Sequence, residues 1–133
     1  MAEALSVFDI FPVSPKRLYE AWLSSIEHSA FTNSVAKIDP RIDGKFSAWD
    51  GYITGKTVTL EPYSRIVQIW RTTDFAEDDP DSILEVLIQP AEVGCQVILN
   101  HTGLPDGRGD EFEQGWEDYY FAPMQGYFQL ETE

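Results

Sequence analysis

Hydrophobic and polar positions change their period twice along this chain of 133 residues. The segment from Leu5 to Phe11 alternates, which is typical of a strand with one buried face. An apolar residue then recurs at every fourth position, which is the spacing of a helical stripe. This stripe consists of Leu18, Trp22 and Ile26. It should break around Ser24 and Ser25, so the pattern predicts two short helices, the first starting at Ser14-Pro15 and the second ending near Phe31.

From Val35 onward the period becomes two, and turn signals such as Asp43-Gly44, Asp50-Gly51 and Glu61-Pro62 divide the alternating runs. This pattern predicts a meander of antiparallel strands. We expect strands over Val35 to Ile38, Lys45 to Trp49, Tyr52 to Leu60, Arg65 to Thr72, Ser82 to Gln89 and Gln96 to Thr102.

The helical period returns after Gly109 and predicts a long C-terminal helix with an aromatic stripe. The stripe consists of Phe112, Trp116, Tyr119, Tyr120, Pro123, Met124, Tyr127 and Phe128. Gly115 and Gly126 cost about 1 kcal/mol each in a helix and Pro123 about 3 kcal/mol, so packing must hold this helix in place. We expect the glycines to let the helix lie close to a sheet and Pro123 to bend it.

These elements together describe an α+β helix-grip architecture: a curved antiparallel sheet of about six or seven strands wrapped on the long C-terminal helix. Two short helices follow the first strand. A chain of this length has room for one domain, which we place over residues 1–133.

The charge balance narrows the classes of partner. Nine basic against 23 acidic residues give a net charge of −14, which disfavours nucleic acid and anionic membranes. No stretch reaches the roughly 18 apolar residues of a membrane span, and the start lacks the basic and apolar regions of a signal peptide. We therefore expect a cytoplasmic protein. The acidic clusters at residues 74–81 and 106–118 are either solvated faces or a surface for a basic partner.

The sequence offers little for catalysis. A nucleophile paired with a base would have to use His28, His101 or Cys95. Cys95 and His101 fall on one face of a strand, where a buried thiol and a hydrogen-bonded core histidine explain them better than a catalytic pair does. We find no phosphate loop, metal set or catalytic motif, and we expect no catalytic residue, no metal and no cofactor.

Several short stretches, in their order and spacing, resemble one known family. They are Phe31-Thr32-Asn33-Ser34, Gly44-Lys45-Phe46-Ser47, Asp50-Gly51-Tyr52-Ile53-Thr54-Gly55, Ile66-Val67-Gln68-Ile69-Trp70-Arg71, Gly103-Leu104-Pro105 and Gly115-Trp116-Glu117-Asp118-Tyr119-Tyr120-Phe121. The chain resembles the domain of the activator of heat-shock protein 90 (Hsp90) ATPase, within the START-like (SRPBCC) superfamily. In the activators this domain is the C-terminal half of a longer protein.

The resemblance implies that one alternating set of strand residues faces the long helix: Ile66, Gln68, Trp70, Leu84, Val86, Ile88, Val97 and Leu99. START-like relatives often hold an apolar ligand between helix and sheet. A ligand cavity would be lined by Phe46, Gln68, Trp70, Leu84, Val86, Leu99, His101, Trp116, Tyr120 and Met124. The alternative is that aromatic side chains fill this space as an ordinary core.

The opposite face of the sheet should be polar if it meets only water, but it carries apolar residues on three successive strands. These residues are Val67, Ile69, Ile83, Leu87 and Ile98. Such a patch is typical of a partner interface, filled by a second copy or by a chaperone, although strand propensity could also explain it.

Three functions are consistent with these patterns. The resemblance favours a non-catalytic, co-chaperone-like protein that contacts a Hsp90-type chaperone. The cavity would instead suit a carrier or sensor of a small apolar ligand, and an enzyme acting in that cavity is the third alternative.

Overall fold

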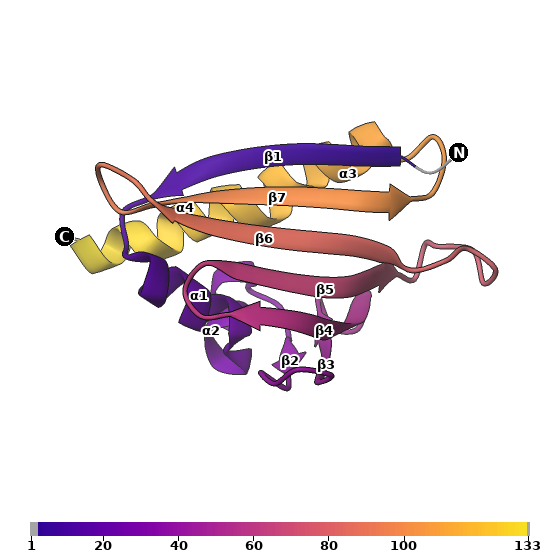
Figure 1. Ribbon diagram of the computed structural model, residues 1–133, viewed down its shortest axis with the longest axis horizontal. Helices are drawn as coiled ribbons and strands as arrows, with labels where there is room; N and C mark the ends of the chain where they lie inside the picture. The colour runs from indigo at the N-terminus through magenta and orange to yellow at the C-terminus, as the bar shows by residue number, and fades with distance from the viewer. Residues whose placement is uncertain (1–2, 133) are drawn as a thin grey trace.

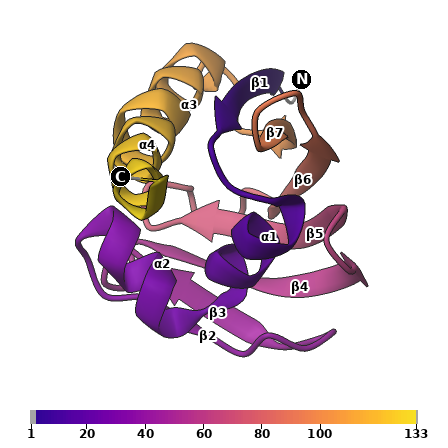
Figure 2. The ribbon, with the colours of Figure 1, turned by 90° about the vertical axis from the view of Figure 1, so that its left-hand side faces the viewer.

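The computed structural model describes residues 3–132 and places a curved, seven-stranded antiparallel sheet around a C-terminal helix (Figures 1 and 2). The strand order is β1-β7-β6-β5-β4-β3-β2. The strands are β1 (Glu3–Phe11), β2 (Lys37–Ile38), β3 (Lys45–Ala48), β4 (Ile53–Glu61), β5 (Arg65–Thr72), β6 (Ser82–Pro90) and β7 (Cys95–Leu104). The helix-grip prediction is confirmed.

Two short helices, α1 (Pro15–Leu23) and α2 (Ser25–Thr32), follow β1 as predicted. The Ser14 side chain accepts a hydrogen bond from the Arg17 N–H, and the Ser24 side chain accepts one from the Glu27 N–H. Each serine therefore caps a helix, and Ser24 forms the break between them. Asn33 ends α2 in the left-handed region, with φ of 57°.

The second strand is shorter than the predicted run from Val35 to Ile38. Lys37 and Ile38 pair with Ser47 and Phe46 of β3, and α2 binds the other side of this segment. The Ala36 and Ile38 N–H groups donate to the hydroxyls of Ser29 and Ser25, each over 2.8 Å. The contacts of these two serines cover part of an edge that would otherwise expose unpaired backbone groups.

The C-terminal helix comprises α3 (Gly109–Trp116), a π-helical turn η1 (Glu117–Phe121), α4 (Ala122–Gln129) and a final 3-10 turn η2 (Leu130–Thr132). In η1 the Ala122 N–H donates to the Glu117 carbonyl, five residues back. This wider turn directly precedes Pro123, whose ring would clash with the carbonyl four residues earlier in a regular α-helix. The proline is thus accommodated by a π turn.

The predicted role of the helix glycines is wrong. A methyl group added at Gly126 would meet nothing within 4 Å, and one at Gly115 would meet only a Tyr119 ring carbon at an ordinary 3.8 Å. Neither glycine is needed for a close approach to the sheet. The start of α3 is instead held by the first strand, because the Glu3 carboxylate accepts the Gly109 N–H over 2.9 Å.

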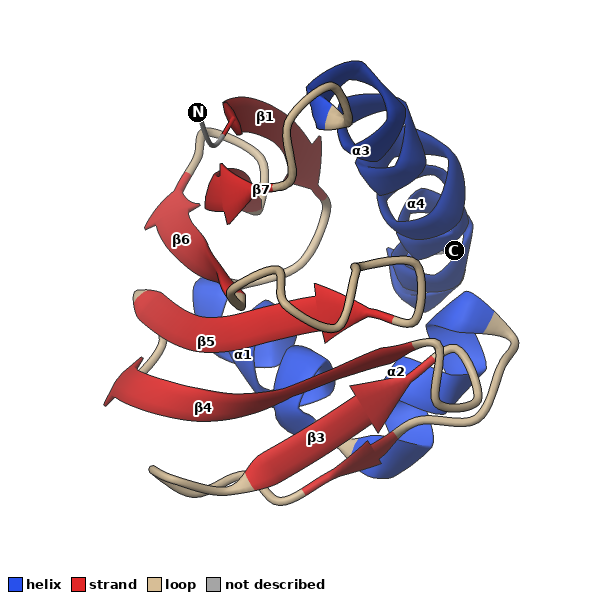
Figure 3. Ribbon diagram, turned by 90° about the vertical axis from the view of Figure 1, so that its right-hand side faces the viewer, coloured by secondary structure: helices blue, strands red, loops and turns tan. Residues whose placement is uncertain are grey.

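The helix lies on one face of the sheet, here called the inner face, and the alternation predicted for that face is confirmed. The predicted inward residues are all buried: Ile66, Gln68, Trp70, Leu84, Val86, Ile88, Val97 and Leu99. Figure 3 shows β1, β7 and β6 on one side of the helix and the other strands turning beneath it. None of the described helices is long and apolar enough to cross a membrane.

Candidate binding surfaces

The space between the helix and the inner face is packed with rings. Trp116 lies 4.8 Å from Tyr120, 5.5 Å from Trp70 and 6.5 Å from Trp22, measured between ring centroids. All ten predicted cavity residues are buried, so they do point into this space. Seven of them, however, contribute to this packing without bordering the pocket described below: Phe46, Gln68, Leu84, Val86, Leu99, His101 and Met124.

His101 is fully buried within this packing, and its hydrogen bonds run in one direction. The Trp116 indole N–H can only donate, and it donates to His101 Nδ1 over 3.1 Å. His101 Nε2 must then carry the proton and donate to Ser82 Oγ over 2.8 Å, while the Ser82 hydroxyl donates to the Trp70 carbonyl over 2.7 Å. Burial lowers the pKa of His101 to about 3, which keeps the ring neutral.

This direction decides what the pair can do chemically. A base that activates serine must accept its proton, whereas His101 gives a hydrogen bond to Ser82. Both side chains are fully buried, so no substrate reaches them in this conformation. Cys95, at the far end of β7, is buried as well, and burial raises the pKa of its thiol to about 11. These groups therefore serve the core.

His28 is the second buried histidine and is fixed in the same manner. Its Nδ1 lies 2.9 Å from the Trp22 carbonyl and must donate to it, so Nε2 accepts the Tyr120 hydroxyl, also at 2.9 Å. Burial lowers the pKa of His28 to about 4 and raises that of Tyr120. The two histidines thus tie α2, β6 and β7 to the C-terminal helix.

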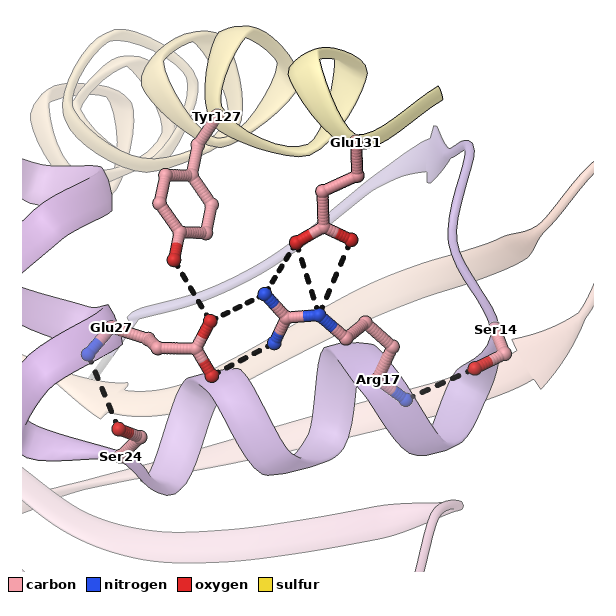
Figure 4. A network of polar contacts seen from close by, with 6 residues as sticks. All are labelled: Ser14, Arg17, Ser24, Glu27, Tyr127 and Glu131. Atoms are coloured by element: carbon pink, nitrogen blue, oxygen red, sulfur yellow. Dashed lines mark hydrogen bonds and ion pairs between the residues drawn. The ribbon is translucent and has the colours of Figure 1, made fainter. Parts of the chain in front are cut away.

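A polar network closes one end of this space, where α4 meets α1 and α2 (Figure 4). Arg17 forms ion pairs with both Glu27 and Glu131, and the Tyr127 hydroxyl donates to Glu27 over 2.8 Å. The hydrogen bonds from Arg17 lower the pKa of Glu27 and raise that of Arg17 itself. We call Arg17, Glu27, Tyr127 and Glu131 the clasp.

The other end is open. A pocket of about 120 Å³ lies between the turn that joins β3 to β4 and the junction of α3 with η1. Its floor is formed by the buried rings of Trp70, Phe112, Trp116 and Tyr120. Its rim is formed by the more exposed rings of Trp49, Tyr52 and Tyr119. Trp70, Trp116 and Tyr120 are the three predicted cavity residues that line it.

The opposite face of the sheet, the outer face, carries a polar row between two apolar groups. In the row, Ser6 donates to Asn100, Asn100 donates to Glu85, and Arg65 donates to Glu85 over 2.8 Å. The hydrogen bonds from Asn100 and Arg65 lower the pKa of Glu85. The apolar groups are Ile69 with Ile83 on one side and Phe8, Leu87 and Ile98 on the other, with each group aligned across neighbouring strands.

Two features of the outer face differ from the prediction. Val67 is only 9% exposed. Glu85 lies directly opposite it on β6, and Arg65 lies two residues earlier on the same face of β5. Arg65 and Glu85 form an ion pair, and together they cover Val67. Phe8 and Ile10 were missed, although they are 65% and 48% exposed. They join the face because β1 pairs with β7, and the alternation of Leu5 to Phe11 contained that signal.

The acidic cluster at residues 74–81 is partly neutralised within the chain. Arg71 donates to Asp81 over 2.7 Å and to the Ala76 and Asp79 carbonyls, which fixes the loop that follows β5. In the second cluster Arg108 pairs with Glu111 over 2.7 Å. No group of three or more His, Cys, Asp or Glu side chains within residues 3–132 is arranged to hold a metal ion.

Comparison with known proteins decides the family. The model of the family described as activator of Hsp90 ATPase homolog 1-like protein matches residues 12–129. This chain belongs to that family. Membership confirms the resemblance drawn from the sequence stretches that run from Phe31 to Phe121.

The relatives carry corresponding names. The activator of 90 kDa heat shock protein ATPase homolog from Dictyostelium discoideum is 28% identical over 115 residues, which cover 86% of this chain and 30% of that protein. Homolog 1 from Homo sapiens is 27% identical over 124 residues, which cover 93% of this chain and 36% of that protein. The chain therefore spans about a third of the length of these curated relatives.

Solved structures confirm the fold. A HSP90 activator from Plasmodium falciparum aligns with a TM-score of 0.84 at 21% identity, covering 93% of this chain and 94% of that one. CalU16 from Micromonospora echinospora aligns with a TM-score of 0.79 at 20% identity, covering 98% of this chain and 79% of that one.

Proposed function

We propose that this chain is a non-catalytic binding domain that contacts a Hsp90-type chaperone in the cytoplasm through the outer face of its sheet. Family membership and the names of the relatives support the choice of partner. The observation that carries the proposal is the exposure of Phe8, Ile10 and Ile83 on a face where a protein that meets only water would carry polar side chains.

The energetics of the outer face favour a partner. Full burial of a large apolar side chain stabilises by about 1.5–3 kcal/mol, and this face holds several such side chains that the chain itself leaves uncovered. The polar row between them supplies Asn100 and Glu85 for directional contacts. The net charge of −14 would complement a basic surface and speed the encounter with it.

Such a domain would act by preferring one conformation of the chaperone, since a ligand shifts an equilibrium only through unequal affinity for the two states. No chemistry of its own is required. The direction of the Ser82–His101 hydrogen bond and the burial of Cys95 support a non-catalytic role.

The test is the affinity of the purified chain for the Hsp90 of the same organism, measured by isothermal titration calorimetry. The double variant Ile83→Lys with Leu87→Lys should bind at least about tenfold more weakly, because it places charges in the centre of the interface. The control is Ile26→Lys with Val93→Lys, which adds the same charge at exposed positions away from both apolar groups and should change the affinity less than about twofold.

Two results would contradict this assignment. Unchanged affinity of a folded Ile83/Leu87 variant would exclude this face as the chaperone interface. A concentration-dependent dimer in light scattering, abolished by the same variant, would show that a second copy covers the face instead.

A second candidate function is the binding of a small ligand, and the open aromatic pocket is the observation that favours it. Buried side chains pack the inner face beneath the middle of the helix, so a ligand is better placed in the open pocket. At about 120 Å³ the pocket suits a group of the size of one aromatic ring.

A further inference from the structure

The pocket between the β3–β4 turn and the C-terminal helix differs from an ordinary apolar hollow in what surrounds it. Of the side chains that line it, Glu111 is the charged one, and the wider mouth outside adds Asp118. Tyr52, on the rim, donates its hydroxyl hydrogen to Asp74 over 2.6 Å. Aromatic walls are thus combined with carboxylates at the entrance.

The charges at this entrance do not cancel. Arg108 pairs with Glu111 over 2.7 Å and lies 3.9 Å from Asp74, so one guanidinium faces two carboxylates. Asp118 accepts a hydrogen bond from the neutral Gln114 side chain over 3.0 Å. Three carboxylates against one cation leave the mouth negative within a chain that is already strongly acidic.

The local backbone is also unusual. Trp49 and Asp50 have φ of 53° and 54°, and Gly51 follows with φ of 89°, so three consecutive residues of the turn are left-handed. This conformation is unfavourable for a residue as bulky as tryptophan and is found mostly where structure or function requires it. Here it brings Trp49 to the rim, where its ring meets that of Tyr119 edge-on at 5.6 Å.

Aromatic faces attract cations, and negative charge at the entrance strengthens that preference. Two rings in this region already bind cationic side chains of the chain itself. The Arg108 guanidinium lies 5.1 Å from the Phe112 ring centroid, and the Arg71 guanidinium lies 5.4 Å from that of Phe75. An anion would be repelled, and a neutral apolar group would gain nothing from the carboxylates.

We propose that this pocket binds a small organic cation that carries a trimethylammonium group. A primary ammonium is strongly hydrated and needs acceptors for its three N–H groups, whereas the floor of the pocket is formed by four rings. A methylated ammonium has no N–H to satisfy and fits an aromatic wall. This inference rests on the second candidate function, ligand binding at the pocket, and is independent of chaperone binding.

The experiment compares choline with 3,3-dimethylbutan-1-ol, its uncharged carbon isostere, by following the tryptophan indole N–H signals of the full chain in NMR titrations. Choline should bind about tenfold more tightly, as the cation–π attraction of a partly desolvated site implies. Tyr119→Leu should weaken choline binding several-fold, and its side chain is exposed enough for the fold to be unaffected. The matched control is Tyr63→Leu, an exposed tyrosine outside the pocket, which should change nothing.

The charge contribution is tested with Asp118→Asn, which should weaken binding of choline and leave that of the isostere unchanged. Equal or tighter binding of the isostere would overturn the cation proposal while leaving the pocket as a ligand site. Absence of binding by both probes would overturn the cation proposal and the second candidate function together.

Discussion

The two faces of the sheet handle polar and apolar groups in opposite ways. On the inner face the polar side chains of His101, Gln68 and Ser82 each have a defined hydrogen-bond partner, as does His28 of α2, which packs against the C-terminal helix. No buried side-chain nitrogen or oxygen among the described residues lacks one. On the outer face the polar row is satisfied, while large apolar side chains remain uncovered. The inner face therefore specifies the fold, and the outer face and the open pocket are the surfaces that we propose for recognition.

The largest effect should come from removing Trp116, which touches Trp70, Trp22 and Tyr120 and donates to His101. Trp116→Ala should lower the free energy of unfolding by about 3–5 kcal/mol, because it opens a cavity and leaves His101 Nδ1 without its donor. Urea denaturation measures this loss. Trp116→Phe restores most of the volume but not the donor, so it should recover part of the stability. Equal stability of both variants with the parent chain would contradict the inner-face packing.

The pH dependence of stability tests the two buried histidines. Their folded pKa values, about 4 for His28 and about 3 for His101, lie below the ordinary value of 6.5. Between these values the unfolded chain binds protons that the folded chain excludes, so stability falls as the pH falls below about 6.5. Between pH 7 and pH 5 each histidine should cost about 2 kcal/mol of stability.

The check is a series of urea denaturations from pH 7.5 to pH 5. His28→Gln and His101→Gln will each be less stable than the parent at neutral pH, so the informative quantity is the slope of stability against pH. Each variant should lose about half of the parental slope. A parent chain whose stability is constant over this range would show that the histidines are not held neutral.

The sharpest comparison of the two faces uses one strand and one residue type. Ile88 and Ile83 both belong to β6, but Ile88 is 2% exposed on the inner face and Ile83 is 50% exposed on the outer face. Ile88→Ala should cost about 2–5 kcal/mol of unfolding free energy, and Ile83→Ala less than about 1 kcal/mol. A similar cost for both substitutions would mean that the outer face is already covered, as in a dimer.

The sequence predicted the architecture well because each element has a local cause. Ser14, Pro15 and Ser24 set the two short helices, and alternation sorted the inner from the outer residues of β5, β6 and β7. The errors arise where contacts between residues far apart in the sequence determine the structure. The second strand is short because its partner β3 ends at Ala48, before the left-handed Trp49 and Asp50.

The candidate sites were harder to predict for a related reason. The predicted stripe contains Tyr119 and Tyr120 but not Phe121, whereas the structure exposes Tyr119 and buries Phe121 beside Tyr120. The π turn adds one residue to the helical repeat at this point. Alternation identifies Gln68 and His101 as inward-facing, but it cannot show that rings fill the space around them. Trp49, Tyr52 and Tyr119 come together only through the left-handed turn after β3, for which Asp50-Gly51 was the one sequence signal.

The smallest expected effect concerns the clasp and asks whether polar contacts or buried rings hold the closed end of the helix. Arg17→Leu keeps the aliphatic bulk beside Phe128 but leaves Glu27 and Glu131 without their shared cation. Because these groups are only partly buried, the loss should be about 1–2 kcal/mol of unfolding free energy, and it should shrink in high salt. The control is Arg41→Leu, which removes an exposed pair with Asp39 and should leave the free energy of unfolding unchanged within the error of the measurement. Hydrogen exchange locates the effect: in Arg17→Leu the amides of α4 should exchange faster while those of β6 and β7 keep their protection. Faster exchange throughout the sheet would show that the clasp, and not the ring packing around Trp116, holds the helix on the inner face.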